Sequence, residues 1–126
     1  ENDNNLIKFP LQGTGLETRA FCYIEDFIDG LMTILEKGEH LEIYHIGTME
    51  EVSIKKIAEE IGKYFGKEVE IISGEEAKGG TKRRCPDITK LKKLGFSPKF
   101  TVEAGLKKSI KWYIENSDKI RKLENE

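Results

Sequence analysis

The strongest constraint on the fold is the alternation of short apolar runs with longer segments whose apolar residues recur at helical spacing. Between residues 24 and 35 the apolar side chains follow a period of about 3.6 residues, and Gly38 stands just beyond this segment as a stop. Apolar runs such as 6–11 and 69–73 have the length of strands. This alternation predicts an α/β or α+β fold with few, short strands.

The expected elements follow one another with short connections. Strands are expected over residues 6–11, 19–24, 41–46 and 69–73, and helices over residues 25–37, 54–65, 88–94 and 102–116. Ser53, Asp87 and Thr101 precede three of the helices, and their side-chain oxygens suit them to cap the first free N–H groups. These strands are too few and too short for a complete wound sheet. Residues 117–126 are expected to form a charged, frayed tail.

The expected strand over residues 41–46 has side chains that alternate between two faces. One face carries Leu41, Ile43 and His45, and the other carries Glu42, Tyr44 and Ile46. Gly13-Thr14-Gly15 is expected to be a hairpin turn and not the start of a dinucleotide-binding motif, because an extended run follows it instead of a helix.

Charge is distributed unevenly along the 126 residues, although 21 basic and 23 acidic side chains give a net charge of only −2. Residues 1–77 carry 7 basic and 17 acidic side chains, whereas residues 78–93 carry 7 basic and 1 acidic. A compact basic segment on an acidic body predicts a localised anion site more than a nucleic-acid surface, which needs a basic face or stripe.

Several classes of protein are excluded by what the sequence lacks. It has two histidines, no HExxH or CxxC metal spacing and no nucleophile-elbow motif. No apolar run reaches the roughly 18–20 residues of a membrane span. Cys22 and Cys85 are expected to be reduced thiols of a cytoplasmic protein. The chain begins at Glu1 without a methionine, and we expect it to be a piece of a longer protein.

Residues 78–87 form a basic loop, which places two glycines, Arg83, Arg84 and an expected helix start close together. Guanidinium groups match phosphate oxygens with two parallel hydrogen bonds, and glycines let the backbone approach a bulky anion. The alternative is a solvent-exposed loop that pairs with the acidic body. Arg19 is similarly ambiguous, because it can point either to water or into a cleft.

Four strings in this order resemble one enzyme family. Residues 13–26 (GTGLETRAFCYIED) and residues 83–98 (RRCPDITKLKKLGFSP) are similar to two segments of extended short-chain dehydrogenase/reductase enzymes. Residues 43–54 and 103–113 resemble two further stretches of the same family. The resemblance covers about residues 9–114. It is to the nucleotide-sugar epimerases, dehydratases and decarboxylases, which use bound NAD.

The resemblance implies that residues 1–126 form a single substrate-binding lobe, the C-terminal portion of such an enzyme. NAD would bind to an N-terminal Rossmann half, and the catalytic Tyr-x-x-x-Lys pair would also lie there. Tyr64 is followed by Lys67, one residue too close for this pair. The resemblance therefore implies no catalytic or cofactor-binding residue on this chain.

Site residues follow from the same resemblance. Arg19 matches an arginine that contacts the nucleotide diphosphate, and either Arg83 or Arg84 matches a second one. His45 stands where the family usually has an asparagine that lines the nucleotide site. Glu17 replaces the commoner glutamine, and Asp26 is read as structural.

The expected function is thus nucleotide-sugar binding within an NAD-dependent epimerase, dehydratase or decarboxylase. Its expected partners are a nucleotide-diphosphate sugar and the Rossmann half, without nucleic acid or membrane, in a homodimeric parent. Two alternatives remain. One is a stand-alone anion-binding or nucleotide-sugar-binding module without catalysis, and the other is an oligonucleotide-binding domain that uses residues 78–93, which lack interleaved aromatics.

Overall fold

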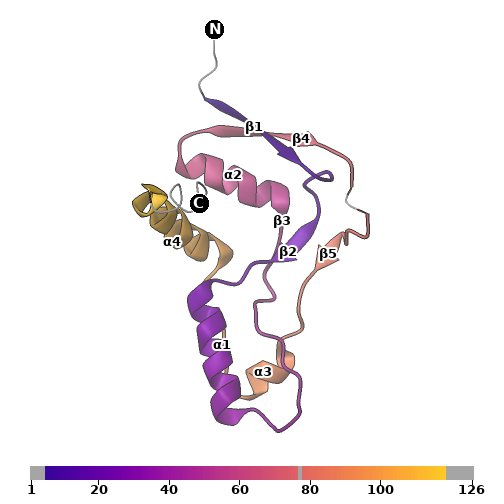
Figure 1. Ribbon diagram of the computed structural model, residues 1–126, viewed down its shortest axis with the longest axis vertical. Coiled ribbons are helices and arrows are strands. Elements are labelled where there is room, and N and C mark those ends of the chain that lie inside the picture. The colour runs from indigo at the N-terminus through magenta and orange to yellow at the C-terminus, as the bar shows by residue number, and fades with distance from the viewer. Residues whose placement is uncertain (1–4, 77, 119–126) are drawn as a thin grey trace.

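The computed structural model describes residues 5–76 and 78–118, and it has an α/β architecture (Figure 1). The elements in chain order are β1 (Leu6–Leu11), β2 (Thr18–Ala20), α1 (Ile24–Lys37), β3 (Glu51–Ser53), α2 (Ile54–Tyr64), β4 (Glu68–Ser73), β5 (Arg83–Arg84), α3 (Thr89–Lys93) and α4 (Val102–Glu115). The tail expected over residues 117–126 lies, from residue 119 onward, outside the described residues.

Two small sheets organise the strands. Strand β1 pairs in parallel with β4, from Leu6 opposite Glu68 to Leu11 opposite Ser73. Strand β2 lies between β3, to which it is antiparallel, and β5, to which it is parallel. Helix α2 packs against β4 so closely that a Cβ atom at Gly62 would lie 2.4 Å from a methyl group of Val69. Figure 1 shows the β1–β4 sheet with α2 at one end of the molecule and α1 with α3 at the other.

The buried core lies between α1, α3 and the chain that follows α1. Ile88, Leu91 and Phe96 are almost fully buried, and Ile34, Tyr44, Ile46 and Leu94 pack against them. Asp26 is also buried, and its two carboxylate oxygens accept hydrogen bonds from the backbone N–H groups of Lys99 and Phe100, at 2.9 and 3.0 Å. The expected structural role of Asp26 is confirmed.

Two of the three expected caps are confirmed. The hydroxyl of Ser53 accepts a hydrogen bond from the backbone N–H of Lys56 at the start of α2, and Thr101 accepts one from Ala104 at the start of α4. The third prediction was one residue out. Ile88 is the N-cap of α3, and Asp87 instead accepts a bond from the Thr89 N–H at 2.9 Å.

The strand expected over residues 41–46 was wrong, because this segment pairs with no other strand among the described residues. The side-chain alternation is nevertheless present. Tyr44 and Ile46 pack against the core, whereas Leu41 and Ile43 are 88% and 77% exposed. A strand needs a neighbour for its N–H and C=O groups, so the pattern alone does not produce one. The expectation also missed β3 and β5, which are only a few residues long.

Candidate anion-binding site

The pairing of β2 with β5 brings together two arginines that are 65 positions apart in the sequence. Arg19 of β2 is the register partner of Arg84 of β5, and Thr18 is the partner of Arg83. Side chains of register partners project from the same face of a sheet, and those of successive residues project from opposite faces. The sheet therefore places Arg19 and Arg84 on one face and Arg83 on the other.

Arg83 is engaged on its own face. Its guanidinium donates to both carboxylate oxygens of Glu51, from Nε at 3.1 Å and from Nη2 at 2.8 Å. The hydroxyl of Thr18 donates to the same carboxylate at 2.5 Å. These bonds, with that of Thr18 as the main cause, hold the pKa of Glu51 below its ordinary value. Arg83 is thus neutralised within the sheet.

Arg19 and Arg84 are held by neutral groups instead. Arg19 donates from Nη1 to the carbonyl oxygen of Thr18 at 2.6 Å and from Nη2 to that of Thr81 at 2.9 Å. Arg84 donates from Nε to the hydroxyl of Thr81 at 2.8 Å. Within the part of the chain that the structure describes, neither guanidinium has a carboxylate within 4 Å. Like charges on facing strand positions repel, so this pair leaves a local excess of positive charge.

An open hollow lies over this pair. It has a volume of about 550 Å³ and is lined by Arg19, Ala20, Arg83, Arg84, Cys85 and Pro86. A smaller hollow of about 180 Å³ adjoins Arg19 and is lined also by Glu17, Glu76 and Thr81. Acidic side chains thus border the smaller hollow, whereas the larger one has none in its lining. The positive charge of the pair therefore faces the larger hollow.

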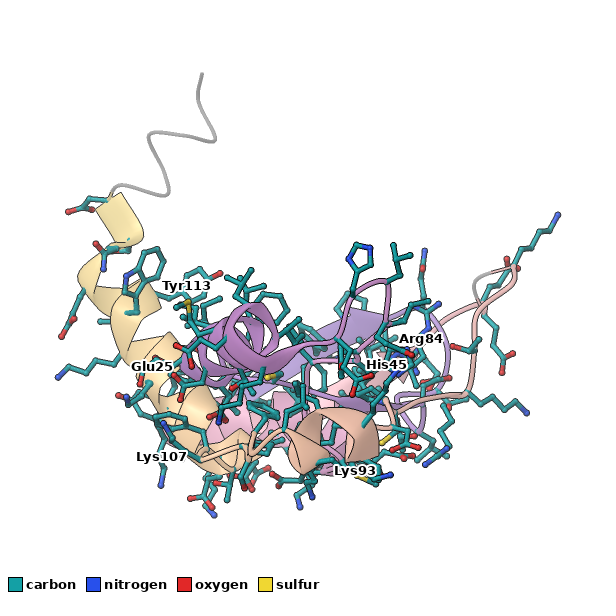
Figure 2. The ribbon with its side chains drawn as sticks, turned by 90° about the horizontal axis from the view of Figure 1, so that it is seen from below. Glu25, His45, Arg84, Lys93, Lys107 and Tyr113 are labelled. Atoms are coloured by element: carbon teal, nitrogen blue, oxygen red, sulfur yellow. The ribbon has the colours of Figure 1, made fainter. Side chains whose placement is uncertain are left out.

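His45 lies near this region, and within the described part of the chain no hydrogen bond or ion pair joins it to Arg19, Arg83 or Arg84. The segment that follows Arg84 runs beside the segment that follows His45, since a Cβ atom at Gly47 would meet Pro86 at 3.0 Å. Asp87 accepts hydrogen bonds from Thr89, which are the main cause of its lowered pKa, and the nearby His45 lowers that pKa further. Figure 2 shows His45 and Arg84 on one side of the molecule, away from Tyr113 and Lys107. The structure thus brings Arg19 and Arg84 together, leaves Arg83 on the opposite face and places His45 at the margin.

The chain turns at residues 13–15 as expected, but the expected hairpin was wrong, because β1 pairs with β4 whereas β2 pairs with β3 and β5. Glu17 closes the turn. The Glu17 carboxylate accepts hydrogen bonds from the backbone N–H groups of Thr14, at 3.1 Å, and Gly15, at 2.8 Å. These bonds, with that of Thr14 as the main cause, lower the pKa of Glu17. Gly13 and Gly15 have φ of 89° and 81°, values that glycine adopts without strain. The turn leads into β2, so it offers no helix N-terminus for a dinucleotide, and these residues do not fit NAD.

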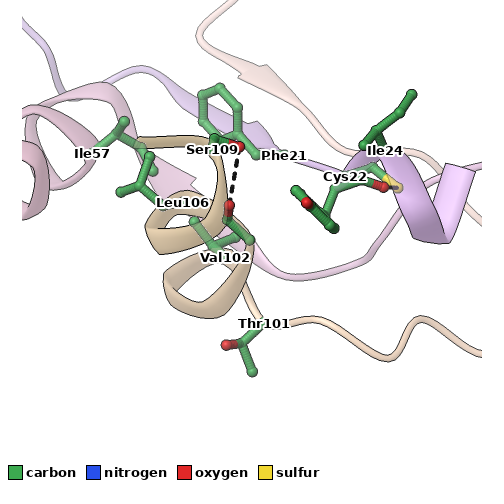
Figure 3. Close-up of a pocket in the computed structure, with 10 residues that line it drawn as sticks. Phe21, Cys22, Ile24, Ile57, Thr101, Val102, Leu106 and Ser109 are labelled. Carbon is green, nitrogen blue, oxygen red and sulfur yellow. Dashed lines mark hydrogen bonds between the residues drawn. The ribbon is translucent and has the colours of Figure 1, made fainter. Parts of the chain in front are cut away.

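A separate hollow is apolar (Figure 3). It has a volume of about 360 Å³ and is lined by Phe21, Cys22, Tyr23, Ile24, Ile57, Thr101, Val102, Gly105, Leu106 and Ser109. Burial raises the pKa of the Cys22 thiol, and the nearby Asp26 adds to this effect. Because no charged side chain lines this hollow, it is unsuited to a diphosphate.

The sequence did not predict a role for two residues that contact Arg19, Arg83 and Arg84. Thr81 and Glu51 decide which arginines are free, yet neither belongs to a recognisable motif. Their roles depend on the register of β5 against β2, which a two-residue strand does not reveal in the sequence. Among the described residues there is no cluster of three His, Cys, Asp or Glu side chains that could hold a metal ion, and no helix is long and apolar enough to cross a membrane.

The comparisons with known proteins agree with this fold. No family model matches the chain. The chain is 36% identical over 113 residues to a dTDP-D-glucose 4,6-dehydratase of Bos taurus. This match covers 84% of this chain and 32% of the relative. A dTDP-glucose 4,6-dehydratase of Bacillus anthracis, solved in complex with NAD, is 30% identical with a TM-score of 0.77, over 88% of this chain and 36% of that one.

A second solved structure has a bound nucleotide sugar. The UDP-glucuronic acid 4-epimerase of Bacillus cereus, in complex with UDP-glucuronic acid and NAD, is 32% identical with a TM-score of 0.71, over 78% of this chain and 32% of that one. The chain spans about a third or less of the length of the curated relatives it matches.

Fold and site together define an α/β domain that presents two unneutralised arginines at an open hollow. The relatives make the assignment more specific. Over 78–88% of its length the chain is similar to extended short-chain dehydrogenase/reductase enzymes, among them nucleotide-sugar epimerases and dehydratases, and it corresponds to about a third of each of them.

Proposed function

We propose that this chain is the nucleotide-sugar-binding portion of an NAD-dependent epimerase, dehydratase or decarboxylase. The observation that carries the proposal is the pair Arg19 and Arg84, register partners on adjacent strands without a counter-ion among the described residues. A diphosphate that binds between two such guanidiniums relieves their repulsion and forms charge-assisted hydrogen bonds with both.

The role of the pair is to bind and orient. Arg84 has its Nε bonded to Thr81, and both of its terminal amino groups are without a partner among the described residues, so they are available for two parallel bonds to phosphate oxygens. Holding the diphosphate fixes the position of the attached sugar, which lowers the entropic cost of reaction. NAD supplies hydride transfer in this family, and we assign both its binding and the catalytic residues to a part of the enzyme outside this chain.

The geometry narrows the set of residues that we propose as diphosphate ligands. Arg19 and Arg84 are proposed as diphosphate ligands, and His45 as a marginal contact whose imidazole can donate a hydrogen bond. Arg83 is proposed to be structural, because Glu51 already pairs with its charge and binds its Nε and Nη2.

Calorimetric titration tests the proposal. The full-length protein that contains this chain is titrated with UDP-glucose, dTDP-glucose and GDP-mannose, and saturable binding of at least one is expected. The same ligand should bind much more weakly to the Arg19→Ala and Arg84→Ala variants. Binding of none of the three, or equal binding by the arginine variants, would contradict the proposal.

A Rossmann half is the proposed partner of the exposed face of α1. One side of α1 is buried through Asp26 and Gly30, while the opposite side exposes a stripe of large apolar residues. This stripe consists of Ile24 (58% exposed), Ile28 (50%), Leu31 (42%) and Leu35 (70%). A helix that is buried on one side and carries large apolar residues on the other is typical of one packed between two layers. Leu41 and Ile43, which follow the helix in the chain, are also largely exposed.

Hydrogen exchange tests this partner. Amides of α1 and residues 41–46 should exchange more slowly in the full-length protein than in residues 1–126 alone, and the isolated chain should bind more hydrophobic dye than a compact protein of similar size. Equal exchange and ordinary dye binding would argue for the stand-alone module. Cytoplasmic location is proposed from the two free thiols, and the homodimeric parent from the family resemblance alone.

A further inference from the structure

We propose that Thr81 is a positioning residue that holds both arginines of the pair in their binding orientation. The inference rests on the proposed function, since it concerns the same diphosphate site. Thr81 is exposed, and it precedes β5 in the basic loop.

Thr81 contacts each arginine through a different atom. Its backbone carbonyl accepts a hydrogen bond from Nη2 of Arg19 at 2.9 Å, and its hydroxyl accepts one from Nε of Arg84 at 2.8 Å. A single residue therefore connects two side chains whose like charges would otherwise drive them apart.

The bond to Arg84 is made at the atom that leaves the ligand-binding end free. Nε lies at the inner edge of the guanidinium, so its bond to Thr81 fixes the plane of the group without occupying the terminal amino groups. Arg83 shows the contrary case. There a carboxylate takes both Nε and Nη2, and its negative charge compensates that of the guanidinium.

The neutral character of Thr81 matters for the same reason. A hydroxyl orients the guanidinium but leaves its charge uncompensated, whereas a carboxylate at this position would also neutralise it. Arginine has much rotational freedom, and holding it before the ligand arrives reduces the entropy that binding must remove.

The backbone places Thr81 where it can reach both groups. The N–H of Thr18 donates to the carbonyl oxygen of Lys82 at 2.9 Å, which fixes the residue next to Thr81 against β2. Gly79, with φ of 76°, allows the loop to turn before this point.

Titration of single and double variants of the full-length protein tests the inference, with UDP-glucose, dTDP-glucose and GDP-mannose as probes. Thr81→Val removes the hydroxyl and keeps the shape, and it should weaken binding of the tightest probe about 3- to 10-fold. Thr81→Ser keeps the hydroxyl and should bind within about twofold of the parent. In an Arg84→Ala background, Thr81→Val should cause no further loss, because the hydroxyl acts through Arg84.

Each outcome is decisive. Parent-like binding by Thr81→Val, equal losses for Val and Ser, or a Thr81→Val loss that persists without Arg84 would overturn the positioning role. If Arg84→Ala itself binds like the parent, the proposed diphosphate site fails instead. Thermal unfolding of each variant checks that the exposed position leaves the fold intact, and Thr81→Ala is the substitute if the valine variant is unstable.

Discussion

Arg83 and Glu51 form a two-bond ion pair on the face of the β2–β5 sheet opposite Arg19 and Arg84. The distances are 3.1 Å from Nε to one carboxylate oxygen and 2.8 Å from Nη2 to the other. This pair gives the two neighbouring arginines of β5 different roles, because successive residues of a strand project from opposite faces. Both arginines line the hollow, but Arg83 is paired with Glu51, whereas Arg84 keeps its positive charge without a counter-ion among the described residues.

Replacing Arg84 by alanine should therefore weaken nucleotide-sugar binding more than replacing Arg83. We expect Arg84→Ala to cost about 1.5–3 kcal/mol of binding free energy, the range for a hydrogen bond to a charged group. That corresponds to a roughly ten- to hundredfold rise in Kd. Arg83→Ala should change the Kd by less than about threefold. Calorimetric titration of the full-length protein measures both.

Lys92 supplies the charge-matched control for these variants. It is exposed on α3, and Lys92→Ala removes one positive charge away from the hollow. Its Kd should match that of the parent. A loss equal to that of Arg84→Ala would mean that net charge, and not the arginine pair, determines affinity.

The lowered pKa of the Glu51 carboxyl predicts that the folded protein loses stability in acid. Its pKa is lowered from the ordinary value of 4.5 in the folded state, so its contribution is fully present above that value. The contribution is lost as the pH falls through the lowered native pKa, because the protonated carboxyl no longer pairs with Arg83. Urea unfolding between pH 6 and pH 3 should show a shallower fall in stability for Glu51→Gln than for the parent. Parallel curves would show that Glu51 is not among the responsible groups.

Asp26→Ala should be strongly destabilising. The buried carboxylate accepts the backbone N–H groups of Lys99 and Phe100, and alanine leaves both donors without a partner. Each such loss costs about 1–3 kcal/mol, so we expect a decrease of about 2–5 kcal/mol in the free energy of unfolding. Asp29→Ala is the matched control, because its ion pair with Lys99 is exposed and such pairs contribute about 0–1 kcal/mol. Similar losses for the two variants would refute the buried role of Asp26.

Gly30→Ala should destabilise the core through overpacking. A Cβ atom at residue 30 would lie 2.5 Å from the Cγ2 methyl of Ile46 and 3.3 Å from the ring of Phe96. We expect a loss of about 1–3 kcal/mol, which exceeds the roughly 0.5–1 kcal/mol that alanine gains over glycine within a helix. Urea unfolding of a double variant with Ile46→Ala should show a combined loss smaller than the sum of the two single losses. Strict additivity would indicate that the two positions do not touch.

The sequence by itself determined the helices and several of their ends. The apolar spacing of α1, α2 and α4 and the caps Ser53 and Thr101 act between residues within about one turn, so the pattern is complete within each segment. The clustering of basic residues likewise located the basic loop, because it can be counted along the sequence without knowing which segments are in contact.

The tertiary structure decided what depends on a partner strand. Segment 41–46 has a strand-like alternation but remains unpaired among the described residues, while β5 is a strand only because β2 lies beside it. The separation of Arg84 from Arg83 follows from that pairing, because a shift of one residue in register would exchange their faces. No local pattern specifies the register of a two-residue strand, so the site was determined by contacts between distant parts of the chain.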